Sequence, residues 1–100
     1  MRVEFSKEFE KSVRKLSGKM LESVREAVQE VMDAEGIEEL TDCKKLVDYD
    51  FIYRLRIGSY RAFFSFHVQI VFYCVMFLYL VPRGQAYDKK MEKNLQRKDV

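Results

Sequence analysis

Three arginines lie close together in YRLRIGSYR, a stretch that runs from Tyr53 to Arg61. They are Arg54, Arg56 and Arg61. Arginine suits phosphate because its planar guanidinium makes paired hydrogen bonds to two oxygens and keeps its charge at any cellular pH. The chemistry to expect is recognition of an anion, or stabilisation of negative charge that grows on a phosphate during a reaction.

Polar and apolar residues alternate on both sides of Gly58-Ser59, which predicts two antiparallel strands joined by a two-residue turn with glycine at the position that needs a positive φ. Such a turn sets the register, with Arg56 opposite Arg61 and Arg54 on the same face. The other face is apolar and is the predicted core. Opposed arginines repel, and no acid within the hairpin relieves them, so an anionic partner is the simplest resolution.

The alternative is an ordinary charged surface, either solvated or paired with acids that folding brings near, such as Asp48, Asp50 or Glu92. Two further residues favour a site. Arg83 lies just past a long apolar segment, and Tyr87 follows four residues later. Each alone is typical of a loop cation or of a tyrosine packed on a sheet, but together with the three arginines they form a candidate site.

The N-terminal half predicts a strand at residues 2–5 and then two amphipathic helices. Ser6 is the expected N-cap of the first helix, which Ser17-Gly18 ends. The second helix covers residues 19–34, with Gly36 as its C-terminal stop. Neither helix can bury its apolar stripe alone, so both should pack on a sheet.

The second half predicts that sheet. Residues 37–50 show no clean period and are expected to be a loop with a short helical turn. Strands follow at residues 51–57, 60–66 and about 70–81; the last is apolar on both faces, which favours a central position, and Pro82 ends it. A basic helix from about Gln85 places Tyr87, Met91 and Leu95 on one face. The prediction is one α+β domain over residues 1–100, with its helices on one side of a small antiparallel sheet.

Composition limits the function classes. With 100 residues, 48% of them hydrophobic, the chain can build one core, and 18 Lys and Arg against 16 Asp and Glu mean that an anion-binding surface must come from local clustering. Cys43 and Cys74 lack CxxC spacing and are expected to be free thiols in a reducing compartment. The charged N-terminus does not resemble a signal peptide, so we expect a cytoplasmic protein.

Two features could mislead. Residues 62–81 are apolar enough to suggest a membrane span, but Ser65 and Gln69 interrupt a segment rich in aromatic and β-branched residues, which favours two buried strands. His67, the only histidine, is expected at the turn between these strands, far from Gly58, in a structural role. No metal-ligand cluster is visible, so we expect neither metal nor cofactor.

The segments KKLVDYDFIYRLRIGSYRAFF, residues 44–64, and LVPRGQAYDKK, residues 80–90, resemble the RelE/ParE superfamily of toxins from type II toxin–antitoxin operons. The elements occur in the family's order over nearly the whole chain, and the hairpin is the most specific part. The resemblance implies a toxin held inactive by an antitoxin, whose disordered or helical segment folds across the helical hairpin and the sheet. It also implies cleavage of ribosome-associated mRNA without metal, in which a 2′-hydroxyl attacks the adjacent phosphate and the 5′-oxygen leaves.

By position, Arg54 and Arg56 match the family's basic strand pair, Arg61 its phosphate-binding arginine, and Arg83 and Tyr87 its C-terminal arginine and tyrosine. RelE itself has lysines in place of the strand pair. Guanidinium handles protons poorly, so electrostatic roles survive this change better than acid–base roles.

Pro82 stands where relatives often have His or Lys, which leaves Tyr87 or a ribosomal group to handle protons. The expected activity is that of an mRNA-cleaving endoribonuclease that inhibits translation. The alternative is a ParE-like toxin that binds DNA gyrase, or an inactive homologue that only binds a partner.

Overall fold

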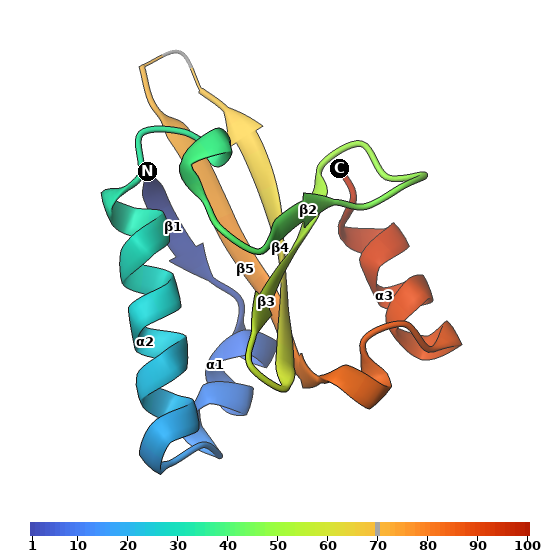
Figure 1. Cartoon of the computed structure of the whole chain (residues 1–100). Helices are drawn as coiled ribbons and strands as arrows, with labels where there is room; N and C mark the ends of the chain where they lie inside the picture. Colours follow the sequence, from blue (N-terminus) through green and yellow to red (C-terminus); the bar gives the residue numbers. More distant parts are fainter. Residues whose placement is uncertain (70) are drawn as a thin grey trace.

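The computed structural model describes residues 1–69 and 71–100, and Figure 1 shows the arrangement of its elements. In chain order they are β1 (Arg2–Phe5), α1 (Lys7–Arg14), α2 (Gly18–Asp33), a 3-10 helix (Ile37–Glu39), β2 (Cys43–Lys45), β3 (Ile52–Ile57), β4 (Tyr60–Val68), β5 (Tyr73–Pro82), a second 3-10 helix (Arg83–Gln85) and α3 (Lys89–Lys98).

The described strands form one sheet in the order β1-β5-β4-β3-β2. β2, β3, β4 and β5 pair antiparallel, but β1 runs parallel to β5, so the sheet is mixed rather than wholly antiparallel. The helical hairpin lies between β1 and the remaining strands in the sequence. β5 lies inside the sheet between β1 and β4, which explains why its sequence is apolar on both faces, and the middle position belongs to β4.

Helices cover both faces of this sheet, so the prediction that all of them lie on one side is wrong. α1 and α2 pack on one face and α3 on the other (Figure 1). The reason lies in neighbouring residues of β4. Phe63 and Phe64 point to opposite faces, and both are 0% exposed, so each face needs a cover.

The two covers give two cores. The core under α1 and α2 contains the buried residues Phe9, Val24, Val31, Leu55, Ile57, Ala62, Phe64, Val75, Phe77 and Leu80. The core under α3 contains Ile52, Phe63, Leu78, Ala86, Met91 and Leu95. This second core borders the face of the hairpin that carries the arginines.

The strand at Arg2–Phe5 and the cap of α1 are confirmed. The Ser6 hydroxyl accepts from the backbone N–H of Phe9 at 3.0 Å and donates to the carbonyl of Leu78 at 2.6 Å. Ser6 therefore begins α1 and also fastens it to β5.

The predicted stop of α2 at Gly36 is wrong. The helix ends at Asp33, and Ala34 already has an extended backbone with ψ 146°. Gly36 is extended as well, with φ −163°, so it does not supply the left-handed turn that the sequence suggests. It precedes the first 3-10 helix, which is the short helical turn predicted for this region.

The strand β2 was missed by the sequence prediction, which assigned residues 37–50 to a loop. It pairs with β3 in the register Cys43 to Leu55, Lys44 to Arg54 and Lys45 to Tyr53. Three residues are too few to show a period of two, and two exposed lysines are typical of the edge of a sheet.

The described part of the apolar segment over residues 62–81 contains two strands, β4 and β5, as predicted. Between them the backbone N–H of Gln69 donates to the carbonyl of Phe72 at 2.8 Å. The predicted strand start at position 70 lies outside the described residues; the strand is described from Tyr73. No helix in the described part of the chain is long and apolar enough to cross a membrane.

The C-terminal helix begins later than predicted. Asp88 is its N-cap and accepts from the backbone N–H of Met91 at 2.8 Å, so α3 starts at Lys89. Met91 and Leu95 are buried on one face as predicted. Tyr87 lies before the helix and is 60% exposed, so its predicted place on the buried helix face is wrong.

Candidate functional site

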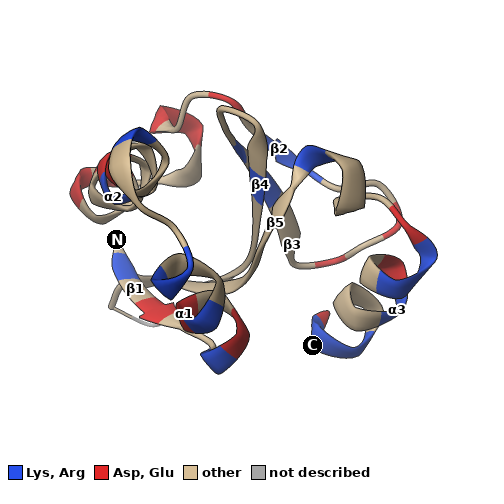
Figure 2. Cartoon of the chain, turned by 90° about the horizontal axis from the view of Figure 1, so that it is seen from below, with Lys and Arg blue, Asp and Glu red and all other residues tan. Residues whose placement is uncertain are grey.

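The hairpin has the register that the turn predicts. Arg56 is opposite Arg61, Arg54 is opposite Phe63, and Gly58 in the turn has φ 57°. Because directly opposite residues share a face, Arg54, Arg56 and Arg61 lie on the α3 side of the sheet. These three residues are called the arginine face below. Figure 2 shows basic positions on β2, β3 and β4 around it.

Arg61 is the most buried member of the arginine face, with 7% of its surface exposed. Its Nη1 donates to the carbonyl oxygens of Gly58 and Tyr60, both at 2.9 Å. In the part of the chain that the structure describes, no carboxylate pairs with it. Arg61 is thus a preorganised cation, held by neutral oxygens and opposed by the positive charge of Arg56.

Arg54 lies on β3 and is half-buried. Its Nη1 lies 3.5 Å from the Tyr87 hydroxyl, at the outer limit of a hydrogen bond. Its Nε is buried and has no hydrogen-bond partner among the described residues. An unsatisfied buried donor costs about 1–3 kcal/mol, so Arg54 has the capacity to gain an acceptor.

Arg56 is exposed, and the acid that pairs with it is one that the sequence analysis did not consider. Its Nη2 lies 3.2 Å from Oδ1 of Asp42, and its backbone N–H donates to the Asp42 carbonyl at 3.0 Å. Asp42 precedes the missed strand β2, which explains the omission. With both side chains about half exposed, the pair contributes roughly 0.2–1 kcal/mol and can open at little cost.

Arg83 and Tyr87 reach the hairpin from the end of β5. The backbone N–H of Arg83 donates to the carbonyl of Ser59 at 2.8 Å, which brings this exposed residue next to the hairpin turn. The Tyr87 ring contacts Phe63 edge-on, with centroids 6.2 Å apart, and its hydroxyl faces Arg54. The structure therefore gathers all five residues that the sequence analysis selected at one end of the sheet.

A further cation on this face was missed. Lys44 lies on β2 directly opposite Arg54 and is exposed. The sequence alone offers no signal for it, because its placement depends on the pairing of a three-residue strand.

Three other residues with reactive side chains, His67, Cys43 and Cys74, are not members of this cluster. His67 belongs to β4 rather than to the turn; its ring stacks on Phe51 at 4.6 Å, and its Nε2 is 2.7 Å from the Val100 carbonyl oxygen. Cys43 and Cys74 are free thiols. Burial raises the pKa of the Cys43 thiol from 9.0 to about 11, against the opposing effect of Arg54, so it is a poor nucleophile at neutral pH.

No family model matches the sequence, and no curated protein matches it. Solved structures do match. The RelB–RelE antitoxin–toxin complex from Methanococcus jannaschii aligns with a TM-score of 0.67 and 24% identity over 85% of this chain and 95% of that chain.

Two more matches agree. The archaeal RelE–RelB complex from Pyrococcus horikoshii has a TM-score of 0.61 and 27% identity over 85% of this chain and 97% of that one. The free E. coli toxin RelE, in a mutant form, has a TM-score of 0.70 and 19% identity over 99% of this chain and 97% of that one. The order and pairing of the described elements, together with these likenesses, show that the chain has the fold of the RelE toxins.

Proposed function

We propose that this chain is the toxin of a type II toxin–antitoxin system and acts as a metal-independent endoribonuclease on ribosome-associated mRNA. The observation that carries the proposal is the arginine face, where, among the described residues, Arg61 is buried without an acid beside it and Arg54 keeps an unused donor. Both features destabilise the free protein. A bound phosphate would relieve both, because its oxygens accept hydrogen bonds and its charge offsets the repulsion between the arginines.

The chemistry of RNA cleavage fits such a site. When the 2′-oxygen of a ribose attacks the adjacent phosphorus, negative charge grows on the phosphate oxygens. Donors that are already in place stabilise this charge without rearranging during the reaction. Arg61 meets this condition because two backbone carbonyls hold its guanidinium.

The five residues then take separate roles. Arg54 and Arg61 bind the phosphate that reacts, and Arg56 joins them when its exposed pair with Asp42 opens. Arg83, beside the hairpin turn, contacts a neighbouring phosphate. Tyr87 offers a hydroxyl for proton transfer.

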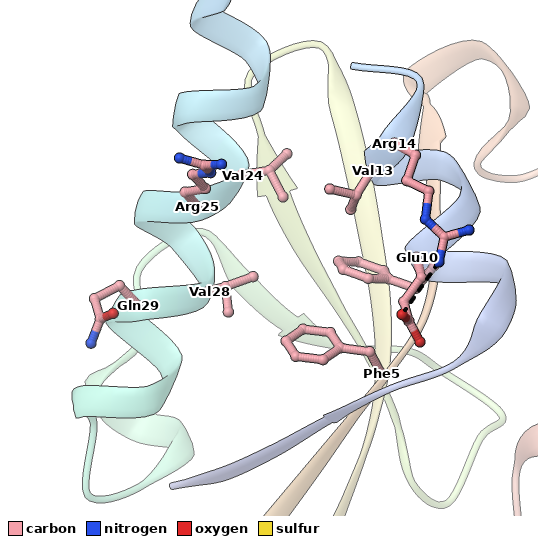
Figure 3. Close-up of a pocket in the computed structure, with 9 residues that line it drawn as sticks. Phe5, Glu10, Val13, Arg14, Val24, Arg25, Val28 and Gln29 are labelled. Carbon is pink, nitrogen blue, oxygen red and sulfur yellow. Dashed lines mark ion pairs between the residues drawn. The ribbon is translucent and has the colours of Figure 1, made fainter. Parts of the chain in front are cut away.

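The antitoxin needs a surface of its own, and the helical hairpin has a suitable groove. A cavity of about 500 Å³ lies between α1 and α2, and Figure 3 shows apolar side chains from both helices pointing into it. It is lined by Phe5, Phe9, Glu10, Val13, Arg14, Val24, Arg25, Val28 and Gln29. Phe5 is 41% exposed there, which is unfavourable unless a partner covers it.

We propose that an amphipathic antitoxin segment folds into this groove, with acidic residues opposite Arg14 and Arg25. Oε2 of Glu10 lies 3.8 Å from Nη2 of Arg14 and only partly neutralises the positive charge on the α1 side of the groove. The RelB–RelE complexes among the structural neighbours support an antitoxin as the partner.

The test is induced expression of the wild type beside an Arg61→Ala, Arg83→Ala double variant, with growth, protein synthesis and mRNA 5′ ends measured in the same cultures. New 5′ ends inside coding regions, absent in the double variant, are the expected result. A Lys89→Ala, Lys90→Ala variant is the matched control, because it removes two exposed charges from α3 and should behave as the wild type.

One observation favours a second candidate, a toxin that binds DNA gyrase. The strand pair consists of arginines, which handle protons poorly. Growth arrest without new 5′ ends, together with a DNA-damage response, would establish that candidate and refute the ribonuclease.

A further inference from the structure

Lys44 lies on the same side of the sheet as the arginine face, although it belongs to β2 and the three arginines belong to β3 and β4. β2 pairs with β3 so that Lys44 is directly opposite Arg54, and residues in that position have Cβ atoms about 4.5–5.5 Å apart on the same side of the sheet. On the other side of Arg54 the same row continues with Phe63 of β4. The Lys44 side chain is exposed, so its amine is accessible to a bound molecule.

Arg54 therefore has a group that can exchange a proton on each side. Lys44 lies on the β2 side. Tyr87 lies on the β4 side, where its ring contacts Phe63 at 6.2 Å and its hydroxyl is 3.5 Å from Nη1 of Arg54. A phosphate bound to Arg54 would have one such group at either flank.

This arrangement matches a requirement of the reaction. In phosphoryl transfer the attacking and leaving oxygens lie roughly in line through the phosphorus, so the two proton transfers take place on opposite sides of the phosphate. Guanidinium groups cannot perform them, because arginine does not lose its proton in proteins. An amine can.

We propose, resting on the ribonuclease function proposed above, that the Lys44 ammonium donates the proton to the leaving 5′-oxygen. The bond from the 2′-oxygen to phosphorus forms while the 2′-hydroxyl proton passes to a water molecule that the Tyr87 hydroxyl orients. The bond from phosphorus to the 5′-oxygen breaks, and that oxygen takes the proton of Lys44. The products are a 2′,3′-cyclic phosphate and a 5′-hydroxyl, and the neutral amine regains a proton from water.

The test replaces the leaving oxygen by sulfur. Sulfur departs without a proton because a thiol holds its proton far less tightly than an alcohol. Once the wild type has mapped a cleavage site on programmed ribosomes, single-turnover rates are measured on two mRNAs, one with the normal 5′-oxygen and one with a bridging 5′-sulfur. Lys44→Arg keeps the charge and loses the transferable proton.

We expect Lys44→Arg to cut the oxygen substrate about 10²-fold or more slowly, the usual contribution of general acid catalysis, and to cut the sulfur substrate within a few-fold of the wild type. Tyr87→Phe should cleave both the oxygen substrate and the sulfur substrate more slowly than the wild type. Affinity for the same complex with a 2′-deoxy nucleotide at the cleavage site, which cannot react, should be unchanged in Lys44→Arg.

Lys45→Arg is the matched control, since Lys45 is adjacent, exposed and opposite Tyr53 on the other face. It should match the wild type on both substrates. If Lys44→Arg cuts the oxygen substrate at the wild-type rate, or is equally slow on both, the assignment of Lys44 is wrong and the ribonuclease function stands. If the wild type cuts neither substrate, the ribonuclease function fails, and the assignment fails with it.

Discussion

Replacing Arg61 by methionine should make the protein more stable and less active. Arg61 is 7% exposed, its described partners are two neutral carbonyls, and it lies opposite Arg56. Burying a cation costs several kcal/mol, and such groups are often replaced by well-packed apolar side chains with a neutral effect or a gain of about 1–4 kcal/mol. A bulky, flexible methionine can fill the space of the arginine stem.

The magnitude follows from what the change removes. Loss of the repulsion between opposed cations contributes roughly 0.2–1 kcal/mol. Loss of the hydrogen bond to Gly58 costs little, because that carbonyl is at an exposed turn where water can replace the guanidinium, and loss of the bond to the half-buried Tyr60 costs about 1 kcal/mol. We expect a net gain of about 1 kcal/mol, which corresponds to a rise in Tm of about 4–8 °C for a domain of this size.

The assay is thermal unfolding followed by circular dichroism, with and without inorganic phosphate. Phosphate should raise the Tm of the wild type, because a ligand that binds the folded state stabilises it, by about 2.7 kcal/mol at a hundred times its Kd. It should raise the Tm of Arg61→Met much less. Arg25→Met on the exposed face of α2 is the control and should change stability by less than about 0.5 kcal/mol.

Two results would refute this reasoning. If Arg61→Met unfolds at a lower temperature than the wild type, the arginine is a structural element rather than an uncompensated charge. If phosphate stabilises both proteins equally, Arg61 does not bind it.

Three further predictions concern the surroundings of the site. Ser6→Ala should lower the free energy of unfolding, measured by urea titration, by about 1–2 kcal/mol, because it removes the cap of α1. Ser17→Ala is the control and should have a smaller effect, since the Ser17 side chain makes no capping hydrogen bond. Equal effects of the two substitutions would contradict this account. In a variant that lacks Cys74, alkylation of Cys43 should be slow at neutral pH, because burial raises the pKa of its thiol to about 11 and keeps it protonated. The alkylation rate should keep rising until the pH passes about 11. A rate that levels off near pH 9 would show that the thiol is not shielded. Asp42→Asn should strengthen RNA binding in filter assays, because it frees Arg56 from its ion pair. The free energy of unfolding should fall by less than about 1 kcal/mol, since asparagine tolerates the left-handed φ of 53° at this position. Unchanged binding would show that the ion pair does not compete with RNA.

Much of the hairpin was predictable because its determinants are local. The turn at Gly58 fixes the register between adjacent strands, and alternation then assigns each side chain to a face. The N-cap at Ser6 was predictable for the same reason, since its partner is only three residues away.

The predictions that were wrong or missing concern short segments of the chain and the placement of helices on the two faces of the sheet. β2 has three residues, too few for a period, and Lys44 and Asp42 were missed with it. The position of α3 was predicted wrongly. The apolar residues on both faces of β4 and β5 indicate that each face of the sheet must be packed against a helix, but they do not indicate which helix packs on which face. Tyr87 was placed on a helix because its spacing to Met91 fits a helical face, whereas the cap at Asp88 starts the helix after it.

The sequence by itself therefore determined the α+β composition, the hairpin and the shared face of its three arginines, all of which depend on neighbours in the chain. Only the tertiary structure decided that Arg83 and Tyr87 reach the hairpin, that Asp42 pairs with Arg56, and that Lys44 lies beside Arg54. These contacts join segments separated by 10 to 33 positions, from Lys44 to Arg54 and from Arg54 to Tyr87. Their formation depends on strand pairing and the packing of two cores, which no local pattern encodes.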